Sequence, residues 1–173
     1  LSYYNITVQN KYLFYTKTQY NKINSQWIEF DVNANPINGL NIHTGISYND
    51  SKVKDAPLAT YLEGLRYQES GPDISYNFWA DYKFKEGFAK NLGIGAGFNG
   101  TSNYDTMVGY KYVTGSFNLP AYTIFNASAY YETNSFRIGV KANNLTDKTY
   151  YSGWSTITPE QPKSFIATLT YKF

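Results

Sequence analysis

Apolar and polar residues alternate along most of the chain with a period of two, the pattern of β-strands that have one apolar face. In the stretch 136–144, Phe136, Ile138 and Val140 alternate with Arg137 and Lys141. The alternation predicts eight strands, each about as long as a tilted membrane strand, at 3–10, 26–35, 40–49, 75–84, 92–99, 122–132, 136–144 and 164–173. We therefore predict an all-β protein with an antiparallel sheet.

The predicted connections alternate between long and short. Those at 11–25, 50–74, 100–121 and 145–163 are long, whereas those at 36–39, 85–91 and 133–135 are short. Outer-membrane barrels have short periplasmic turns and longer extracellular loops. The asymmetry favours a transmembrane β-barrel over a soluble β-sandwich, which shows the same alternation within its strands. It also predicts that the long connections lie outside the cell.

Composition supports a membrane barrel and excludes several other classes of protein. Aromatic residues make up 19% of the chain, yet the mean hydropathy is only −0.48, as expected when one strand face meets lipid and the other meets water. No apolar run is long enough for a transmembrane helix. The absence of Cys excludes disulfides and Cys-based zinc sites, and a net charge of +2 gives no reason to expect nucleic acid as a partner.

The chemistry-bearing motifs do not indicate catalysis. Gly95, Gly97 and Gly100 match a dinucleotide-binding spacing, but turn-forming residues follow where that motif requires a helix. Gly93, Gly95 and Gly97 instead share one strand face, where missing side chains leave room in the lumen or let another element approach. His43 is the only histidine and falls on a polar strand face. We therefore predict no catalytic residues and no metal site.

The long connections concentrate aromatic and basic side chains, which suit a flat, anionic ligand through stacking, cation–π contact and charge. These residues are the predicted ligand-binding set: Arg66, Tyr67, Tyr104, Tyr110, Tyr112, Tyr151 and Trp154.

The segment Asn143-Asn144-Leu145-Thr146-Asp147-Lys148-Thr149-Tyr150-Tyr151 resembles the N-N-L-F-D-K-x-Y-Y signature near the end of TonB-dependent siderophore receptors. As in that family, a loop, a Pro-basic pair (Pro162-Lys163) and a strand of alternating apolar residues ending in Phe follow. The similarity extends upstream through 35–40, 45–48, 71–72 and 119–123. Thr146 stands where the family commonly has Phe, and Asn126 where it commonly has Asp.

The resemblance implies the last third of a 22-stranded barrel, with residues 1–173 forming a C-terminal segment and the N-terminal plug domain with its TonB box lying outside this chain. It implies a receptor of the Gram-negative outer membrane that takes up a ferric siderophore and is not an enzyme. Its partners would be outer-membrane lipid, the TonB complex acting through the plug, and the barrel-assembly machinery. The last strand looks like the signal that this machinery reads, at Phe165, Leu169, Tyr171 and Phe173.

Two alternatives remain open from the sequence. One keeps TonB-dependent uptake but changes the cargo to cobalamin, a glycan or a peptide. The other is a self-contained eight-stranded barrel that serves as an adhesin or membrane anchor.

Overall fold

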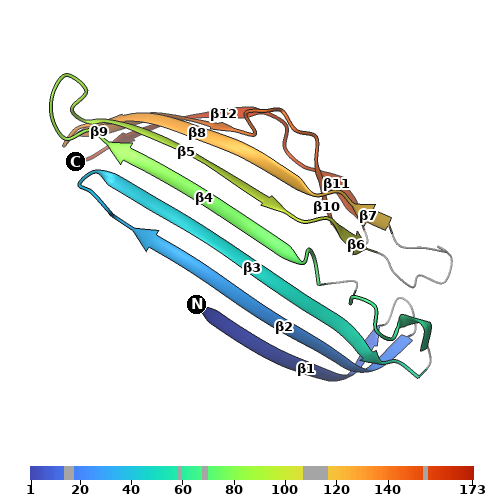
Figure 1. The fold of residues 1–173 in the computed structure, drawn as a ribbon. Coiled ribbons are helices and arrows are strands. Elements are labelled where there is room, and N and C mark those ends of the chain that lie inside the picture. The colour runs from blue at the N-terminus through green and yellow to red at the C-terminus, as the bar shows by residue number, and fades with distance from the viewer. Residues whose placement is uncertain (14–17, 58–59, 68–69, 107–116, 154–155) are drawn as a thin grey trace.

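The computed structural model describes residues 1–13, 18–57, 60–67, 70–106, 117–153 and 156–173. Its main feature is one antiparallel sheet of eight strands (Figure 1). In spatial order these are β1 (Ser2–Leu13), β2 (Thr18–Ala34), β3 (Leu40–Asp55), β4 (Ile74–Lys83), β5 (Leu92–Thr101), β8 (Tyr122–Glu132), β9 (Phe136–Asn143) and β12 (Ser164–Tyr171). Among the described residues, none belongs to a helix long and apolar enough to cross a membrane.

All eight predicted strands are present, which confirms the all-β, antiparallel fold class. Neighbouring strands in the sheet follow one another in the chain, apart from short extra elements inside two connections. These are the hairpins β6 (Tyr104–Thr106) with β7 (Phe117–Leu119), and β10 (Tyr151–Gly153) with β11 (Ile157–Pro159). A 3-10 helix, η1 (Thr60–Leu62), lies in the connection after β3.

The prediction of a long connection at 11–25 is wrong. β1 continues to Leu13 and β2 begins at Thr18, and the two strands stay in register there, with Lys11 opposite Tyr20. Asn, Lys and Thr give this stretch the composition of a loop. Its described parts, 11–13 and 18–25, are held in the sheet by their ladder and by the burial of Tyr20, which is only 3% exposed. Packing therefore overrides the weak strand propensity of the local sequence.

The two ends of the sheet differ, as the loop lengths predicted. We call the end that carries the connections 56–73, 102–121 and 144–163 the loop end, and the β1–β2 hairpin projects from this end too (Figure 1). The turn end carries 35–39, 84–91 and 133–135. Its first turn depends on Gly39, whose φ is +92° and where a Cβ would lie 2.4 Å from the carbonyl oxygen of Lys83. Tight turns at one end thus bring every second connection to the other.

The apolar face of the sheet is exposed along its length. Phe30, Val140 and Leu169 have 48%, 49% and 74% of their surface accessible. In a soluble β-sandwich a second layer would cover such a face, but within the described ranges no layer does. An uncovered apolar face is the arrangement of a membrane strand wall that faces lipid.

The eight strands form an open sheet. β1 and β12 lie at opposite edges, and each pairs with a single neighbour among the described strands (Figure 1). In a barrel closed by eight strands these two would pair with one another. The open edges therefore favour a wall segment of a larger barrel over the self-contained eight-stranded alternative.

Most of the buried apolar residues in the described chain gather at the loop end, over the outer parts of β2 and β3. Ile23 and Val53 are direct cross-strand neighbours on β2 and β3, and the connection 56–73 covers them. We call this group the outer cluster: Tyr20, Ile23, Val53, Ala56, Leu62 and Tyr67. The rings of Tyr20 and Tyr67 meet edge-on at 5.9 Å. This cluster gives the first loop-end connection a folded core of its own.

Candidate functional site

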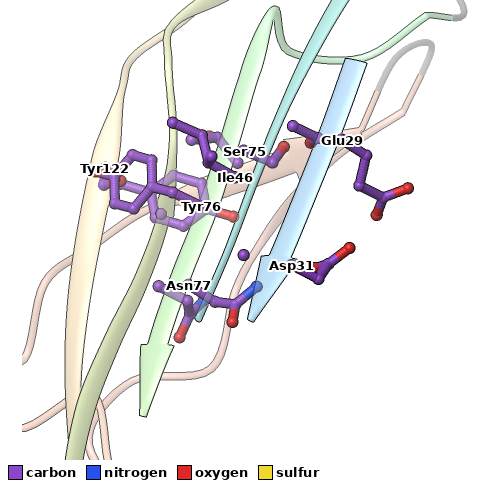
Figure 2. A pocket seen from close by; sticks show the side chains of 12 residues that line it. Glu29, Asp31, Ile46, Ser75, Tyr76, Asn77 and Tyr122 are labelled. Atoms are coloured by element: carbon purple, nitrogen blue, oxygen red, sulfur yellow. The ribbon is translucent and has the colours of Figure 1, made fainter. Parts of the chain in front are cut away.

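The polar face of the sheet carries a cavity of about 270 Å³ in its loop-end half. Figure 2 shows the carboxylates of Glu29 and Asp31, which project from β2, and the Asn77 amide on β4, which is separated from β2 by β3. Among the described residues neither carboxylate forms an ion pair. The wall is polar and negatively charged here, as expected for a water-facing lumen surface.

On the turn-end side of this cavity, two aromatic rings lie against the glycines of β5. Trp79 covers Gly95 and Gly97, where an added Cβ would come within 2.6 and 2.7 Å of its ring, and Tyr130 covers Gly93 at 2.1 Å. The guanidinium of Arg137 lies over the Tyr130 ring, 3.9 Å from the ring centre. The prediction that these glycines let another element approach is confirmed, and the element is an aromatic layer from neighbouring strands.

A second cavity, of about 310 Å³, lies on the same face closer to the loop end. We call it the entrance pocket. Tyr4 on β1, Trp27 on β2 and Asn49 on β3 form one straight row across it, because Trp27 is the register partner of both others. The full lining is Tyr4, Ile6, Ser25, Trp27, Asn49, Ser51, Tyr67 and Ser70. Aromatic and hydroxyl groups on an otherwise polar strand face make this pocket suited to a small organic ligand.

The connection 56–73 closes one side of the entrance pocket because it pairs with the edge of β3. The Tyr67 amide donates to the Ser51 carbonyl at 2.9 Å, and the Val53 amide donates to the Leu65 carbonyl at 3.0 Å. Lys11 stands over the Tyr67 ring, 4.7 Å from its centre. Tyr67, which the sequence predicted as a ligand contact, thus belongs to the pocket wall, although it is only 8% exposed.

Arg66 lies beside the same pocket but binds the protein itself. Its Nη1 donates to the carbonyl of Asn49 at 2.8 Å and pairs with the Asp73 carboxylate, while its Nε donates to the carbonyl of Gly71 at 3.0 Å. Its side chain is 17% exposed. Arg66, which the sequence predicted as a ligand contact, instead links the connection 56–73 to β3 through these contacts.

Tyr104 and Tyr151 come together in a second group formed by the other two loop-end connections. The Tyr104 hydroxyl donates to the carbonyl of Gly153 at 3.0 Å, which joins the β6–β7 hairpin to β10. Tyr151 opens β10 and is 42% exposed. Tyr110, Tyr112 and Trp154 lie outside the described residues. The structure therefore divides the four described members of the predicted ligand-binding set between two separate places.

Two further tyrosines, not singled out from the sequence, stand beside this second group. The rings of Tyr122 and Tyr150 lie 4.4 Å apart. Burial raises the pKa of Tyr104 and of Tyr150 above the ordinary value for a phenol, so both remain neutral hydroxyls at physiological pH. This group offers neutral hydroxyl and ring surface beside the carboxylate of Glu160, which also raises the pKa of both tyrosines.

The signature segment after β9 forms a tight turn around Asn144, which is 1% exposed. Its Oδ1 accepts from the amide of Lys148 at 2.8 Å, and its Nδ2 donates to the carbonyls of Lys148 and Gln161 at 2.8 and 3.3 Å. Asp147 accepts from the amide of Lys163 at 2.9 Å. Both Asn144 and Asp147 have positive φ, which Asn and Asp tolerate better than most residues. The signature thus ties the end of β9 to the chain just before β12.

Asn126 completes this arrangement from β8. Its Oδ1 accepts from the backbone amide of Asn144 at 3.1 Å, so an acceptor oxygen is what the position requires. Asn supplies that oxygen as well as Asp would.

The predicted assembly residues Phe165, Leu169, Tyr171 and Phe173 lie on the apolar side of the last strand and its end, and they are exposed by between 65% and 114%. Tyr171 and Phe173 pack edge-on at 5.4 Å.

Across the described ranges, no group of three His, Asp or Glu side chains is arranged to hold a metal ion.

This chain is similar to known outer-membrane receptors. The ferric-pyoverdine M114 receptor PbuA of Pseudomonas sp. (strain M114) is 31% identical over 134 residues, which are 76% of this chain and 16% of the relative. The chain is homologous to the TonB-dependent siderophore receptors. No family model matches it. The resemblance seen in the signature segment is thereby confirmed, and the chain spans about 16% of the length of its relative.

Solved structures of such receptors share the fold. The siderophore receptor PiuA from Acinetobacter baumannii superposes with a TM-score of 0.75 at 20% identity, over 98% of this chain and 24% of the receptor. The ferripyoverdine receptor of the outer membrane of Pseudomonas aeruginosa gives 0.71 at 18% identity, over 88% and 20%. These relatives are receptors rather than enzymes, and the predicted location in the Gram-negative outer membrane is confirmed.

Proposed function

We propose that this chain is the C-terminal wall segment of a TonB-dependent receptor that imports a ferric siderophore through the outer membrane. The observation that carries the proposal is homology to a ferric-pyoverdine receptor over 76% of the chain. The lumen wall with a lined pocket at its loop end supports it. Residues 1–173 would supply strands and extracellular connections, and a plug domain elsewhere in the protein would occupy the lumen and engage the TonB complex.

Uptake in such a receptor requires capture and release and no chemistry, so we propose no catalytic role. A ferric chelate is the transported ligand and no cofactor is needed. The exposed apolar face would contact outer-membrane lipid, and the last strand would be read by the barrel-assembly machinery.

Growth of a deletion strain tests the function. Under iron starvation, the strain that lacks the full-length receptor should fail to grow on one ferric siderophore and should grow normally on others. Restoring the gene should restore growth. In parallel cultures, the same strain is grown with cobalamin, a glycan or a peptide as the only source of the nutrient that limits growth. Dependence on one of these, with unchanged growth on every siderophore, would replace the iron proposal by another cargo.

Deleting Phe173 tests the proposed assembly signal. We expect the amount of folded receptor in the outer membrane to fall about tenfold or more. The deletion removes the terminal aromatic side chain of an edge strand, which is where the assembly machinery would bind. Heat-modifiable mobility of the full-length receptor measures the folded fraction. Exchange of Phe88 for Ala, at a fully exposed site in a turn-end connection, is the control. Equal folded amounts in all three proteins would disprove the assignment.

A further inference from the structure

One carboxylate stands among the tyrosines of the second loop-end group, where the β10–β11 hairpin lies beside β6 and β7 (Figure 1). The amide of Glu160 donates to the carbonyl of Tyr150 at 3.0 Å, which adds one residue pair to the β10–β11 ladder beyond Tyr151 and Pro159. Cross-strand partners carry their side chains on the same face of a ladder. The Glu160 carboxylate is therefore a neighbour of the Tyr150 ring.

We call Tyr104, Tyr122, Tyr150 and Glu160 the Glu160 cluster. The rings of Tyr122 and Tyr150 lie 4.4 Å apart at 41° to one another and give the cluster an aromatic surface. Tyr104 joins it through its hydrogen bond to the carbonyl of Gly153 on β10. All four residues are partly exposed, so a molecule from the solvent can reach them.

The negative charge of Glu160 has no cation beside it in the described chain. Its Oε1 accepts a hydrogen bond from the Ser152 hydroxyl, and the ion pairs of the described residues all join other side chains. Its Oε2 has no donor among the described residues, although a carboxylate has room for about four hydrogen bonds. The charge is therefore open to a cation from outside.

The phenols add attraction for a cation without adding charge. Burial, and to a smaller extent the charge of Glu160, raises the pKa of Tyr104 and Tyr150 above the ordinary value for a phenol, so both stay protonated at physiological pH. The face of a neutral tyrosine ring attracts a cation that lies within about 6 Å of its centre. An anionic group would gain nothing from the ring faces and would be repelled by the carboxylate.

We propose that the Glu160 cluster binds an organic ammonium group. Glu160 would neutralise the positive charge, and the rings of Tyr122 and Tyr150 would contact the alkyl groups around the nitrogen. A metal cation is a poor alternative, because hard cations take about six or more oxygen ligands and no group of three acidic or His side chains is arranged to hold one within the described ranges. The proposal goes beyond iron uptake, because it adds a ligand class that the capture of a ferric chelate does not require.

Three probes test this ligand class on the purified full-length receptor. Choline carries a quaternary ammonium group, and 3,3-dimethyl-1-butanol has the same shape with a neutral carbon in place of the nitrogen. By magnetic resonance titration we expect choline to bind about tenfold more tightly than the neutral alcohol. Nα-acetyl-lysine amide carries the ammonium group of a protein side chain. Tighter binding of this probe than of choline would identify the ligand as a lysine side chain, and the reverse order would identify it as a small alkylated ammonium compound.

Substitutions assign the binding to the cluster. Glu160→Gln keeps an acceptor for Ser152 and removes the charge, so it should weaken choline binding about fivefold and leave the neutral alcohol unaffected. Glu63→Gln is the matched control, because Glu63 is an exposed carboxylate in the connection 56–73. Tyr150→Leu should weaken choline binding about threefold, and Tyr150→Phe should keep it. Heat-modifiable mobility identifies any variant that does not fold, and Glu160→Gln keeps the test decisive if Tyr150→Leu is such a variant.

Equal affinity for choline in Glu160→Gln and in the unmodified receptor would overturn the proposal. Equal affinity of the unmodified receptor for choline and for the neutral alcohol would overturn it as well. Both results are independent of the growth experiment on siderophores. A receptor that supports growth on a siderophore but binds choline without Glu160 refutes the cluster alone, and one that binds choline through Glu160 but supports growth on no siderophore refutes the iron-uptake proposal alone.

Discussion

Replacing Asn144 with alanine is expected to lower the free energy of unfolding of the full-length receptor by about 3–5 kcal/mol. The substitution removes three side-chain hydrogen bonds in a site that is 1% exposed. It leaves the Lys148 amide and two carbonyls without partners, and each unpaired buried group costs about 1–3 kcal/mol. Alanine also tolerates the φ of +49° less well than asparagine.

Two companion variants separate these causes. Asn143→Ala removes only one long hydrogen bond, to Ser164 at 3.4 Å, and should cost less than about 1 kcal/mol. Asn144→Gly restores the backbone freedom without the hydrogen bonds and should recover about 1 kcal/mol relative to alanine. Urea unfolding in lipid vesicles provides the free energies. A loss in Asn144→Ala no larger than in Asn143→Ala would show that the signature turn does not hold the wall together.

Placing an arginine on the apolar face should also have a large effect. Val140→Arg is expected to cost about 2–4 kcal/mol of folded stability, because a charge near the middle of a membrane strand must leave water for hydrocarbon. Val140 pairs with Ala129 and Ala167 near the middle of β9 and is 49% exposed. The same unfolding measurement in vesicles applies.

Asn77→Lys is the matched control because it adds a cation to the opposite face. Asn77 lines the lumen cavity together with Asp31 and Glu29, so the new ammonium would meet water and carboxylates. We expect a change of less than about 1 kcal/mol. If Val140→Arg and Asn77→Lys had equal effects, the assignment of the apolar face to lipid would be wrong.

The regular part of the wall was predictable because its information is local. A period of two is a property of consecutive residues, so the faces that carry Val140 and Arg137 follow from the sequence alone. The turn end was predictable as well, because tight turns need few residues and are formed by consecutive ones. The signature at 143–151 identified the family without structure because its side chains bond within the same stretch and to the chain close to Lys163.

Predictions for the loop end were wrong where contacts between residues far apart in the chain determine the structure. The residues 11–25 look like a loop, but 11–13 and 18–25 are strand residues, which the ladder between β1 and β2 and the outer cluster keep extended. Arg66 carries the charge that suits an anionic ligand, and only its contacts with Asn49, Gly71 and Asp73 assign it to the protein's own backbone and carboxylate.

The sequence by itself determined the eight strands, the identity of their faces, the short turns at one end of the sheet, and the family, but it predicted wrongly the first of the four long connections. Tertiary structure alone decided that the sheet is open, that aromatic rings fill the space over the β5 glycines, and that Tyr4, Trp27 and Asn49 meet in one row. The physical reason is that alternation fixes which way a side chain points. Register across strands fixes which side chain it meets, and hydrogen bonds between strands far apart in the chain set that register.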